Sequence, residues 1–282
     1  MFSFREIDTK DPAAVQMEVQ LAYLSLFPGG DRYFVPRAFG WAIDSFCGNY
    51  RNYQPIDALY HDFEHTLQGT LCLARILQRR QFAGARPQVL QRHFELGILA
   101  ILLHDTGYLK TRDDTTGTGA KYTFVHVQRS AEFAAQLLSE KRIPARDIRT
   151  VQQLIGCTGV NVEVSGIPFD NETDRVVGLA LGTADLLGQM AADDYLSKLP
   201  ILYLEFAEAE ISRSPDRSPA GFSSAENLMR KTPEFWERFV LPKIQRDFGG
   251  VYRFLNVPFP DGSNDYISRI EANIRRLKEQ FS

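Results

Sequence analysis

The sequence contains little cysteine and no long hydrophobic run. Its 282 residues include three cysteines, Cys47, Cys72 and Cys157, which lie far apart and in no paired spacing. This pattern argues against a disulfide framework and a cysteine-based zinc site, and it fits a reducing compartment. The longest apolar runs are much shorter than the about 20 residues that a helix needs to cross a bilayer.

The sequence also has no block of charge of one sign. Its formal net charge is −3, with acidic and basic residues interspersed. This distribution argues against a dedicated nucleic-acid surface but leaves a local basic pocket open. Residues 1–6 have no basic start followed by an apolar core, so no secretory signal is indicated. We expect a soluble, cytoplasmic protein without a membrane or nucleic-acid partner, and its oligomeric state stays open.

Helical periodicity dominates the chain, and no run of βαβ units appears. With 44% hydrophobic residues, the chain can bury a sizeable core, and we expect a single all-α domain over residues 1–282. Residues 160–164 alternate in a way that predicts a short extended segment, and residues 213–232 read as a surface loop. Helices are predicted over residues 12–27, 35–50, 56–81, 88–105, 130–138, 144–155, 174–211 with a break near Pro200, around Trp236, and 264–280.

Histidines are few but concentrated. Four of the five, His61, His65, His104 and His126, lie in the central region beside carboxylates. His61 and His65 are four residues apart, so on the predicted helix 56–81 they share one face, where two imidazoles can converge on one metal.

The apolar run 98–103 predicts a buried helix that ends abruptly in His104-Asp105. An unpaired carboxylate in the interior would be costly, and a bound cation removes that cost. Gly107 is expected to end this helix in a left-handed conformation. The alternative for His104-Asp105 is a capped helix end with an internal hydrogen bond.

A site made from His65, His104, Asp105 and Asp185 offers two nitrogen and two oxygen ligands. This mixture suits Mn, Fe, Mg, Zn, Co or Ni and does not distinguish among them. Asp105 has a second oxygen that could bridge to a second cation, with His126 on that side. Two divalent ions about 3.5–4 Å apart clamp a phosphoryl group and activate water, so the expected partner is a small-molecule phosphoester.

Some of these ligands have alternatives. Asp193 and Asp194 lie close to Asp185 and could take its place. His126 could instead be a helix cap or a hydrogen-bond donor. His93 is interpreted as a surface residue.

The order His65, His104-Asp105, Asp185 resembles the H…HD…D signature of the HD-domain superfamily of metal-dependent phosphohydrolases. Residues 60–65, Tyr-His-Asp-Phe-Glu-His, are similar to the Tyr-His-Asn-x-x-His element of cyclic-nucleotide phosphodiesterase catalytic domains in that superfamily. The resemblance covers roughly residues 60–185. It implies an HD-like helical bundle with its metal-binding core at about 56–212 and helical additions at 1–55 and 213–282.

The resemblance also assigns chemical roles. His61 becomes the general acid that protonates the departing oxygen, and His65 becomes a metal ligand. Asp105 joins His61 as a catalytic residue because it holds the metal or metals that activate the attacking water. Asp62, which replaces the asparagine of the similar element, either holds a cationic imidazole or lies on the solvent side.

Residues 108–123 form a long polar loop directly after two predicted ligands, which makes it a candidate lid. Lys110, Arg112 and Lys121 are the predicted phosphate-binding residues of this loop, with solvated surface charge as the alternative. Gln189, one turn beyond Asp185, is expected to face the substrate. The aromatics Tyr195, Tyr203 and Phe206 are further pocket candidates.

The sequence therefore predicts a metal-dependent phosphohydrolase that cleaves a nucleotide, a cyclic nucleotide or another phosphoester with a metal-activated water. Three alternatives stay open. The protein could be a regulatory module that binds metal and nucleotide without turnover, an oxygenase with a di-iron site in an HD-type fold, or a structural helical protein.

Overall fold

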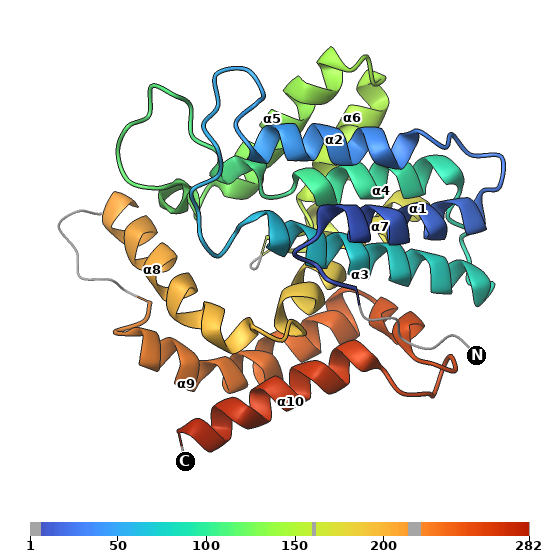
Figure 1. Cartoon of the computed structure of the whole chain (residues 1–282). Helices are drawn as coiled ribbons and strands as arrows, with labels where there is room; N and C mark the ends of the chain where they lie inside the picture. Colours follow the sequence, from blue (N-terminus) through green and yellow to red (C-terminus); the bar gives the residue numbers. More distant parts are fainter. Residues whose placement is uncertain (1–6, 160–161, 214–220, 282) are drawn as a thin grey trace.

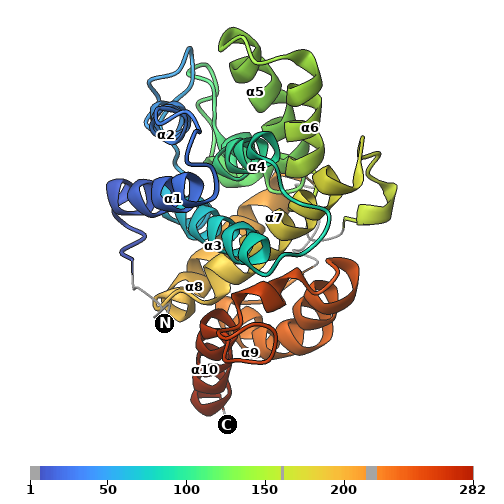
Figure 2. The ribbon, with the colours of Figure 1, turned by 90° about the vertical axis from the view of Figure 1, so that its right-hand side faces the viewer.

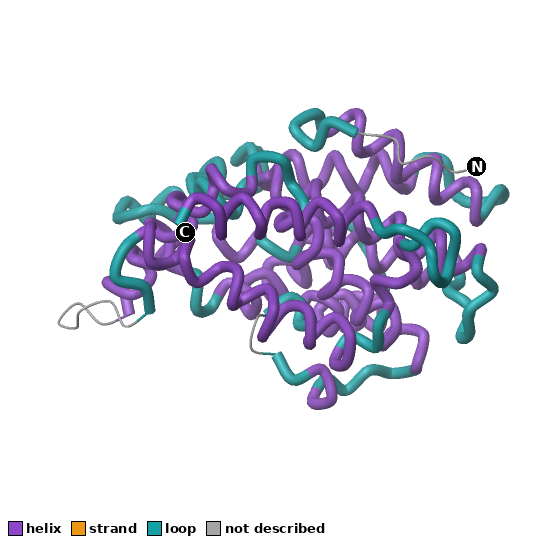
Figure 3. Tube along the Cα trace, turned by 90° about the horizontal axis from the view of Figure 1, so that it is seen from below, coloured by secondary structure: helices purple, strands orange, loops and turns teal. Residues whose placement is uncertain are grey.

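Ten α-helices carry the fold in residues 7–159, 162–213 and 221–281, which are the ranges that the computed structural model describes. No β-strand occurs in those ranges, and the trace alternates between helix and loop (Figure 3). The prediction of an all-α protein is confirmed. Within the described residues, no helix combines the length and apolar character needed to cross a membrane.

The helices are joined by connections of very different length, the longest of which contain short helical turns. They are α1 Pro12–Leu26, α2 Phe34–Phe46, α3 Phe63–Phe82, α4 Gln91–Leu103, α5 His126–Glu140, α6 Ala145–Ile155, α7 Glu172–Met190, α8 Tyr195–Arg213, α9 Ala225–Phe235 and α10 Asp265–Gln280. Short 3₁₀ turns at Thr106–Tyr108 (η1), Gly119–Tyr122 (η2), Val164–Gly166 (η3) and Val251–Leu255 (η6) and π-helical turns at Trp236–Val240 (η4) and Lys243–Asp247 (η5) lie between them.

Helices α3 and α7 pack side by side at the centre of the molecule (Figures 1 and 2). Helices α1 and α4 cover α3, and α5 and α6 pack beside α4. Helices α8, α9 and α10 lie together on the other side, with α10 against α7. One buried hydrophobic cluster extends from Val15 to Leu277, so the N-terminal and C-terminal helices share a core with the central ones.

Helix α3 begins at Phe63, seven residues later than the predicted start at residue 56. Asp62 is its N-cap, and its carboxylate accepts the backbone N–H of His65 at 2.8 Å. The second carboxylate oxygen of Asp62 lies 3.2 Å from the Lys198 ammonium. The cap at Asp62 makes Phe63 the first helical residue, so α3 starts after His61. The prediction that His61 lies on this helix is therefore wrong.

The predicted long helix over residues 174–211 is two helices that meet at residues 191–194, and Pro200 lies inside α8. The break is stabilised from outside: the Asn273 side-chain amide of α10 donates to the carbonyls of Met190 and Ala192, each at 3.0 Å. These bonds satisfy carbonyls that the end of a helix leaves open. Pro200 costs α8 one backbone hydrogen bond without ending it.

Gly107 lies in the turn η1 and has no left-handed backbone, contrary to the prediction. A Cβ at this position would lie 2.0 Å from the His126 carbonyl oxygen. The Gly107 N–H also donates to the Ser130 hydroxyl at 2.8 Å. Glycine is required here because two backbones meet, and this contact brings His126 to the end of α4.

Two other loop predictions have mixed outcomes. Residues 160–161 of the predicted extended segment lie outside the described residues, and Val164 belongs to η3. Residues 225–232 of the predicted loop belong to α9, because Ser224 caps that helix by accepting the Asn227 N–H at 3.0 Å.

Candidate metal centre

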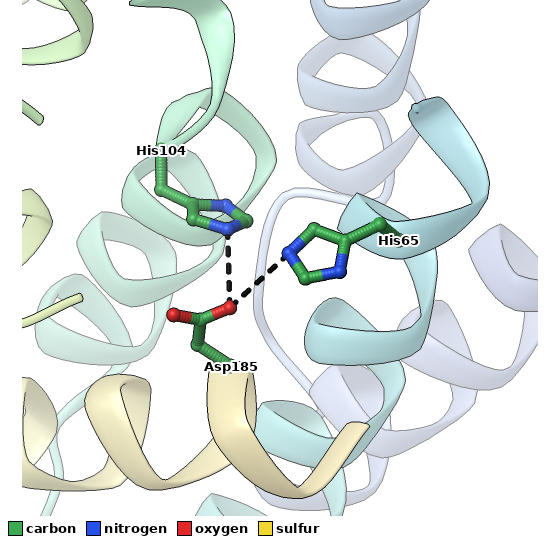
Figure 4. A group of neighbouring side chains, drawn as sticks. All are labelled: His65, His104 and Asp185. Atoms are coloured by element: carbon green, nitrogen blue, oxygen red, sulfur yellow. Dashed lines mark ion pairs between the residues drawn. The ribbon is translucent and has the colours of Figure 1, made fainter. Parts of the chain in front are cut away.

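Three side chains from three helices meet in the interior. His65 lies in the first turn of α3, His104 is the C-cap of α4, and Asp185 lies in the middle of α7. Each offers one ligand atom, and these atoms lie within 4.8 Å of one another. Figure 4 shows both imidazoles directed at the Asp185 carboxylate, at 3.3 Å for His65 Nε2 and 3.4 Å for His104 Nε2.

Asp105 supplies a fourth atom. Its Oδ2 lies 3.2 Å from His65 Nε2 and 3.2 Å from His104 Nε2. Two nitrogens and two oxygens therefore alternate around a ring with nitrogen–oxygen separations of 3.2–3.4 Å. Neighbouring ligand atoms of a cation bound at about 2.0–2.2 Å lie roughly 3–3.5 Å apart, so these four adjacent separations are of the right size. His65, His104 and Asp185 form the compact group among them.

The close crossing of α3 and α7 brings His65 and Asp185 together. A Cβ on Gly188 would lie 2.7 Å from the Gln68 carbonyl carbon, and one on Gly69 would lie 3.7 Å from the Asp185 Cα. The two glycines lie about one turn from the ligands on their helices, so small residues at the crossing set the distance between the ligands.

A hydrogen bond fixes the orientation and the tautomer of the His104 ring. Its Nδ1 lies 2.7 Å from the Ile101 carbonyl oxygen, which can only accept, so Nδ1 carries the hydrogen. Nε2 then keeps its lone pair in the neutral imidazole. Neither His104 Nε2 nor Asp105 Oδ2 has a hydrogen bond of acceptable geometry among the described residues, although both are buried. Two buried polar atoms that lack a hydrogen bond and face one point form a donor set that fits a cation.

Without a cation, the cluster is held by ion pairs. Burial by itself would lower the pKa of His65, but hydrogen bonds to Asp105 and Asp185 raise it to about 9. Burial would likewise lower the pKa of His104, and the Asp105 charge raises it well above the usual range. For Asp185, burial would raise the pKa, and its close contacts with His104 at 3.4 Å and His65 at 3.3 Å lower it to about 2.

His126 lies on the far side of Asp105. Its Nε2 is 3.9 Å from Asp105 Oδ1, while Oδ2 faces the other two histidines. Its Nδ1 lies 2.6 Å from the Thr123 carbonyl oxygen, so Nε2 keeps its lone pair. Burial lowers the pKa of His126. The arrangement places Asp105 between two sets of histidine nitrogens, as a bridging carboxylate requires.

His61 reaches the site from the segment before α3. Its ring centroid lies 5.4 Å from that of His65, so the two histidines are neighbours although they do not share a helix. Its Nδ1 lies 2.5 Å from Oε2 of Glu205 in α8. Burial would raise the pKa of Glu205, but the hydrogen bond with His61 lowers it. The sequence analysis did not identify Glu205, because nothing in the local sequence distinguishes it from Glu208 and Glu210 on the same helix.

Tyr108 is a second residue that the sequence analysis did not single out. Its ring is nearly parallel to that of His61, with centroids 4.4 Å apart, and to that of His126, at 4.7 Å. Burial raises its pKa well above the usual value, and its hydroxyl has no hydrogen-bond partner among the described residues. Tyr108 therefore orients both imidazoles by packing.

The loop cations do not reach the site. Lys110 is buried and pairs with Asp57 at 2.8 Å, and Lys121 pairs with Asp114. Arg112 is exposed. None of these three is among the described residues that line the cavity at the site, so their placement differs from the expectation that they face the substrate.

The loop itself is anchored to its surroundings. Thr118 donates its hydroxyl hydrogen to Glu208 of α8 at 2.6 Å, and the Gly119 N–H donates to Asp57 at 2.7 Å. Part of the segment folds into η2. These contacts hold residues 108–123 in place beside the site.

The other carboxylates and His93 lie elsewhere. Asp193 pairs with Arg269 at 3.1 Å and Asp194 with Lys10 at 3.4 Å, so Asp185 is the acidic residue of this segment that joins the cluster. His93 is half-buried, and its Nε2 lies 3.7 Å from Asp174. The prediction that His93 is a surface residue is therefore wrong.

A cavity of about 600 Å³ opens beside the cluster. His61, His65, Asp105, His126 and Asp185 lie along it. Gln189, the predicted substrate-facing residue, also lines it, together with Tyr195 and Phe206. Tyr203, the third aromatic candidate, is not among the described lining residues.

The fold and the site define a class: an all-helical protein with a buried histidine–carboxylate cluster that is suited to a divalent cation and faces a cavity. The chain belongs to the Npun_R2479-like family, whose model matches residues 40–279 and thus includes every residue of the cluster. The description of that family names no reaction, substrate or cofactor. A search of curated proteins found no match.

Proposed function

We propose that the protein is a metal-dependent phosphohydrolase. The observation that carries the proposal is the ring of His65, His104, Asp105 and Asp185 atoms, with separations of 3.2–3.4 Å, beside a cavity and within reach of a second histidine–carboxylate pair. Its motif order, which resembles the HD superfamily, supports the same reaction class.

The ring residues would hold one divalent cation, and Asp105 Oδ1 with His126 would hold a second. Such ions polarise a phosphoryl oxygen and lower the pKa of bound water. The chain contributes a rigid set of ligands: their helices are packed in the core, so the ligand atoms are positioned before any ion arrives.

His61 is the proposed general acid. With Nδ1 held by Glu205 at 2.5 Å, its other nitrogen is left to deliver a proton to the departing oxygen in the cavity. Glu205 also accepts the Tyr60 N–H at 2.7 Å through Oε1, so both of its oxygens are fixed. Glu205 is therefore a positioning residue that holds the His61 ring in one orientation.

The first test is elemental analysis of the purified protein, with His104→Ala and Asp105→Ala beside the wild type. We expect near-stoichiometric Mn, Fe, Zn, Mg, Co or Ni in the wild type and its loss in both variants. His93→Ala is the matched control, because His93 lies outside the cluster and should leave the metal content unchanged.

The second test is a phosphoester panel with the metal that is found. We expect release of phosphate or a phosphomonoester by the wild type and none by His104→Ala. Stoichiometric metal without turnover of any ester would contradict the proposed enzyme and favour a binding module. If the protein binds no metal after incubation with Mn or Fe while circular dichroism shows an intact fold, the proposed metal site is contradicted.

A further inference from the structure

The two sides of the cavity differ in chemistry. The side formed by α3, the end of α4 and α7 carries the histidines and carboxylates, whereas α8, Phe222 and α9 form an apolar wall. Phe206 and Phe222 stack in this wall, with ring centroids 6.0 Å apart and planes 19° from parallel. The wall consists of Leu199, Leu202, Phe206, Phe222, Leu228 and Phe235.

The three threonines of the cavity use their hydroxyl hydrogens elsewhere. Thr123 donates to the Ala120 carbonyl at 2.6 Å, Thr158 to the Ile155 carbonyl at 2.8 Å, and Thr232 to the Leu228 carbonyl at 2.9 Å. Each hydroxyl is bonded to the backbone one turn earlier and is not free to donate to an occupant.

Both the oxygen and the nitrogen of the Gln189 amide make hydrogen bonds within the protein. Its Oε1 accepts the Tyr60 hydroxyl at 2.7 Å, and its Nε2 donates to the Asp185 carbonyl at 3.1 Å. A nucleobase presents several donors and acceptors, and leaving them unpaired in an apolar cavity is costly. The residues of this cavity thus offer a base few hydrogen-bond partners.

Positive charge is scarce along the cavity. Lys231 is the one lysine or arginine among the described lining residues, and it is exposed. Its ammonium lies 5.5 Å from the Phe222 ring centroid, at the apolar wall. An occupant with several phosphates would therefore find little charge compensation away from the histidine–carboxylate side.

We propose that the substrate is a phosphoester of a hydrophobic alcohol, with its phosphoryl group at the cluster and its hydrocarbon body on the wall of α8 and α9. This inference rests on the proposed function. In the reaction, water adds its oxygen to phosphorus, the bond between phosphorus and the alcohol oxygen breaks, and that oxygen takes up a proton. For a monoester the products are inorganic phosphate and the free alcohol.

The test compares hexyl, octyl and decyl phosphate with adenosine monophosphate, using the full chain loaded with the metal that elemental analysis finds. We expect kcat/KM to rise about fourfold for each buried methylene until the cavity is filled. The nucleotide should be cleaved at least 100-fold less efficiently than decyl phosphate.

A matched pair of variants in α8 tests whether the apolar wall causes the dependence of kcat/KM on chain length. Leu202 lines the cavity, whereas Leu204 on the same helix is 62% exposed and does not. Leu202→Gln should flatten the dependence on chain length and lower kcat/KM for decyl phosphate at least tenfold. Leu204→Gln should behave as the wild type.

Binding of decylphosphonate, measured by calorimetry, provides a readout that needs no turnover. We expect a negative heat-capacity change for the wild type and weaker binding to Leu202→Gln. Nucleotide cleavage without dependence on alkyl chain length would overturn this inference and leave the proposed function intact. Leu202-dependent phosphonate binding without cleavage of any ester would overturn the proposed function and keep the assignment of the wall. Failure of decylphosphonate to bind would overturn the inference.

Discussion

At the scale of single residues, the candidate site depends on neighbouring residues that fix the orientation of its side chains. Ile101 fixes the His104 tautomer, Glu205 holds His61, and Tyr108 packs against His61. Neighbouring residues of this kind hold a metal ligand or a general acid in one orientation. Substitution of such a neighbour is expected to lower activity more than stability.

Glu205→Gln tests the pairing with His61. The amide keeps the size of the side chain, but its nitrogen cannot accept a hydrogen bond, so it cannot hold the Tyr60 N–H and the His61 ring together as Glu205 does. We expect kcat to fall at least tenfold while KM stays within about twofold of the wild type. Glu210→Gln, on the same helix, is the control and should leave both constants unchanged. Equal kcat values for all three proteins would contradict the positioning role.

The ion pairs of the cluster predict the pH dependence of the chelator-treated protein. The pKa of His65 rises from 6.5 to about 9, so its contribution to stability is complete below pH 6.5 and is lost as pH rises toward 9. The pKa of Asp185 falls from 3.8 to about 2, so its contribution is present above pH 3.8 and is lost as pH falls toward 2.

Urea unfolding across pH 3–9 measures this effect. We expect these two groups to stabilise the fold most between pH 3.8 and 6.5. With metal present, the alkaline loss should disappear, because the metal takes the place of the protons. A profile that does not fall between pH 6.5 and 9 in chelator would contradict the assignment.

At the scale of helices, small residues and caps set where the ligands lie. The contact between Gly188 and the backbone of Gln68 sets the spacing of α3 and α7, and Asp62 sets where α3 begins. A change at either position alters the site without touching a ligand.

Gly188→Ala is expected to separate α3 from α7, because its Cβ would lie 2.7 Å from a backbone carbon. We expect a loss of about 1–3 kcal/mol in the free energy of unfolding and reduced metal content. Gly40→Ala in α2 is the matched control: a Cβ there meets nothing within 4 Å, and the fold should gain about 0.5–1 kcal/mol. Denaturant titration and elemental analysis distinguish the two; equal effects would refute the role of the crossing.

Asp62→Ala removes the cap of α3 and is compared with Asp11→Ala, which removes the cap of α1. Each should lose about 1 kcal/mol of stability. Asp62→Ala alone should also weaken metal binding, because Asp62 holds the turn that contains His65. Asp62→Asn should restore both properties, since asparagine caps equally well. A normal metal affinity in Asp62→Ala would show that the cap does not position the ligand.

At the scale of the whole molecule, the C-terminal helices belong to the site. Helix α8 supplies Glu205, and α9 supplies Leu228 and Lys231 to the cavity. The described part of the predicted addition at residues 213–282 therefore lines the cavity through Phe222 and α9, and it shares the buried core with the central helices.

Metal binding should stabilise this whole core, because the proposed ligands come from α3, the end of α4 and α7, which all pack in it. At about 100 times Kd, a ligand that binds only the folded state adds about 2.7 kcal/mol. For a chain of this size we expect Tm to rise by roughly 5–10 °C. His104→Ala should show no rise under the same conditions. A Tm that metal does not change in the wild type would contradict a preformed site.

Local patterns predicted much of the fold. Residues 12–27 and 264–280 gave helices close to α1 and α10, because apolar periodicity and the cap residues Asp11 and Asn264 act over one or two turns. The abrupt end of the apolar run at His104-Asp105 predicted a buried pair of polar residues, and both are buried.

The rest depended on contacts between distant segments. The end of α7 relies on Asn273 of α10, the place of His126 relies on a backbone contact at Gly107, and the pairing of His61 relies on Glu205. The sequence by itself determined which residues could act as ligands, because that is a property of their side chains. Only the tertiary structure decided which of them meet, since packing of α3, α4, α7 and α8 sets those distances.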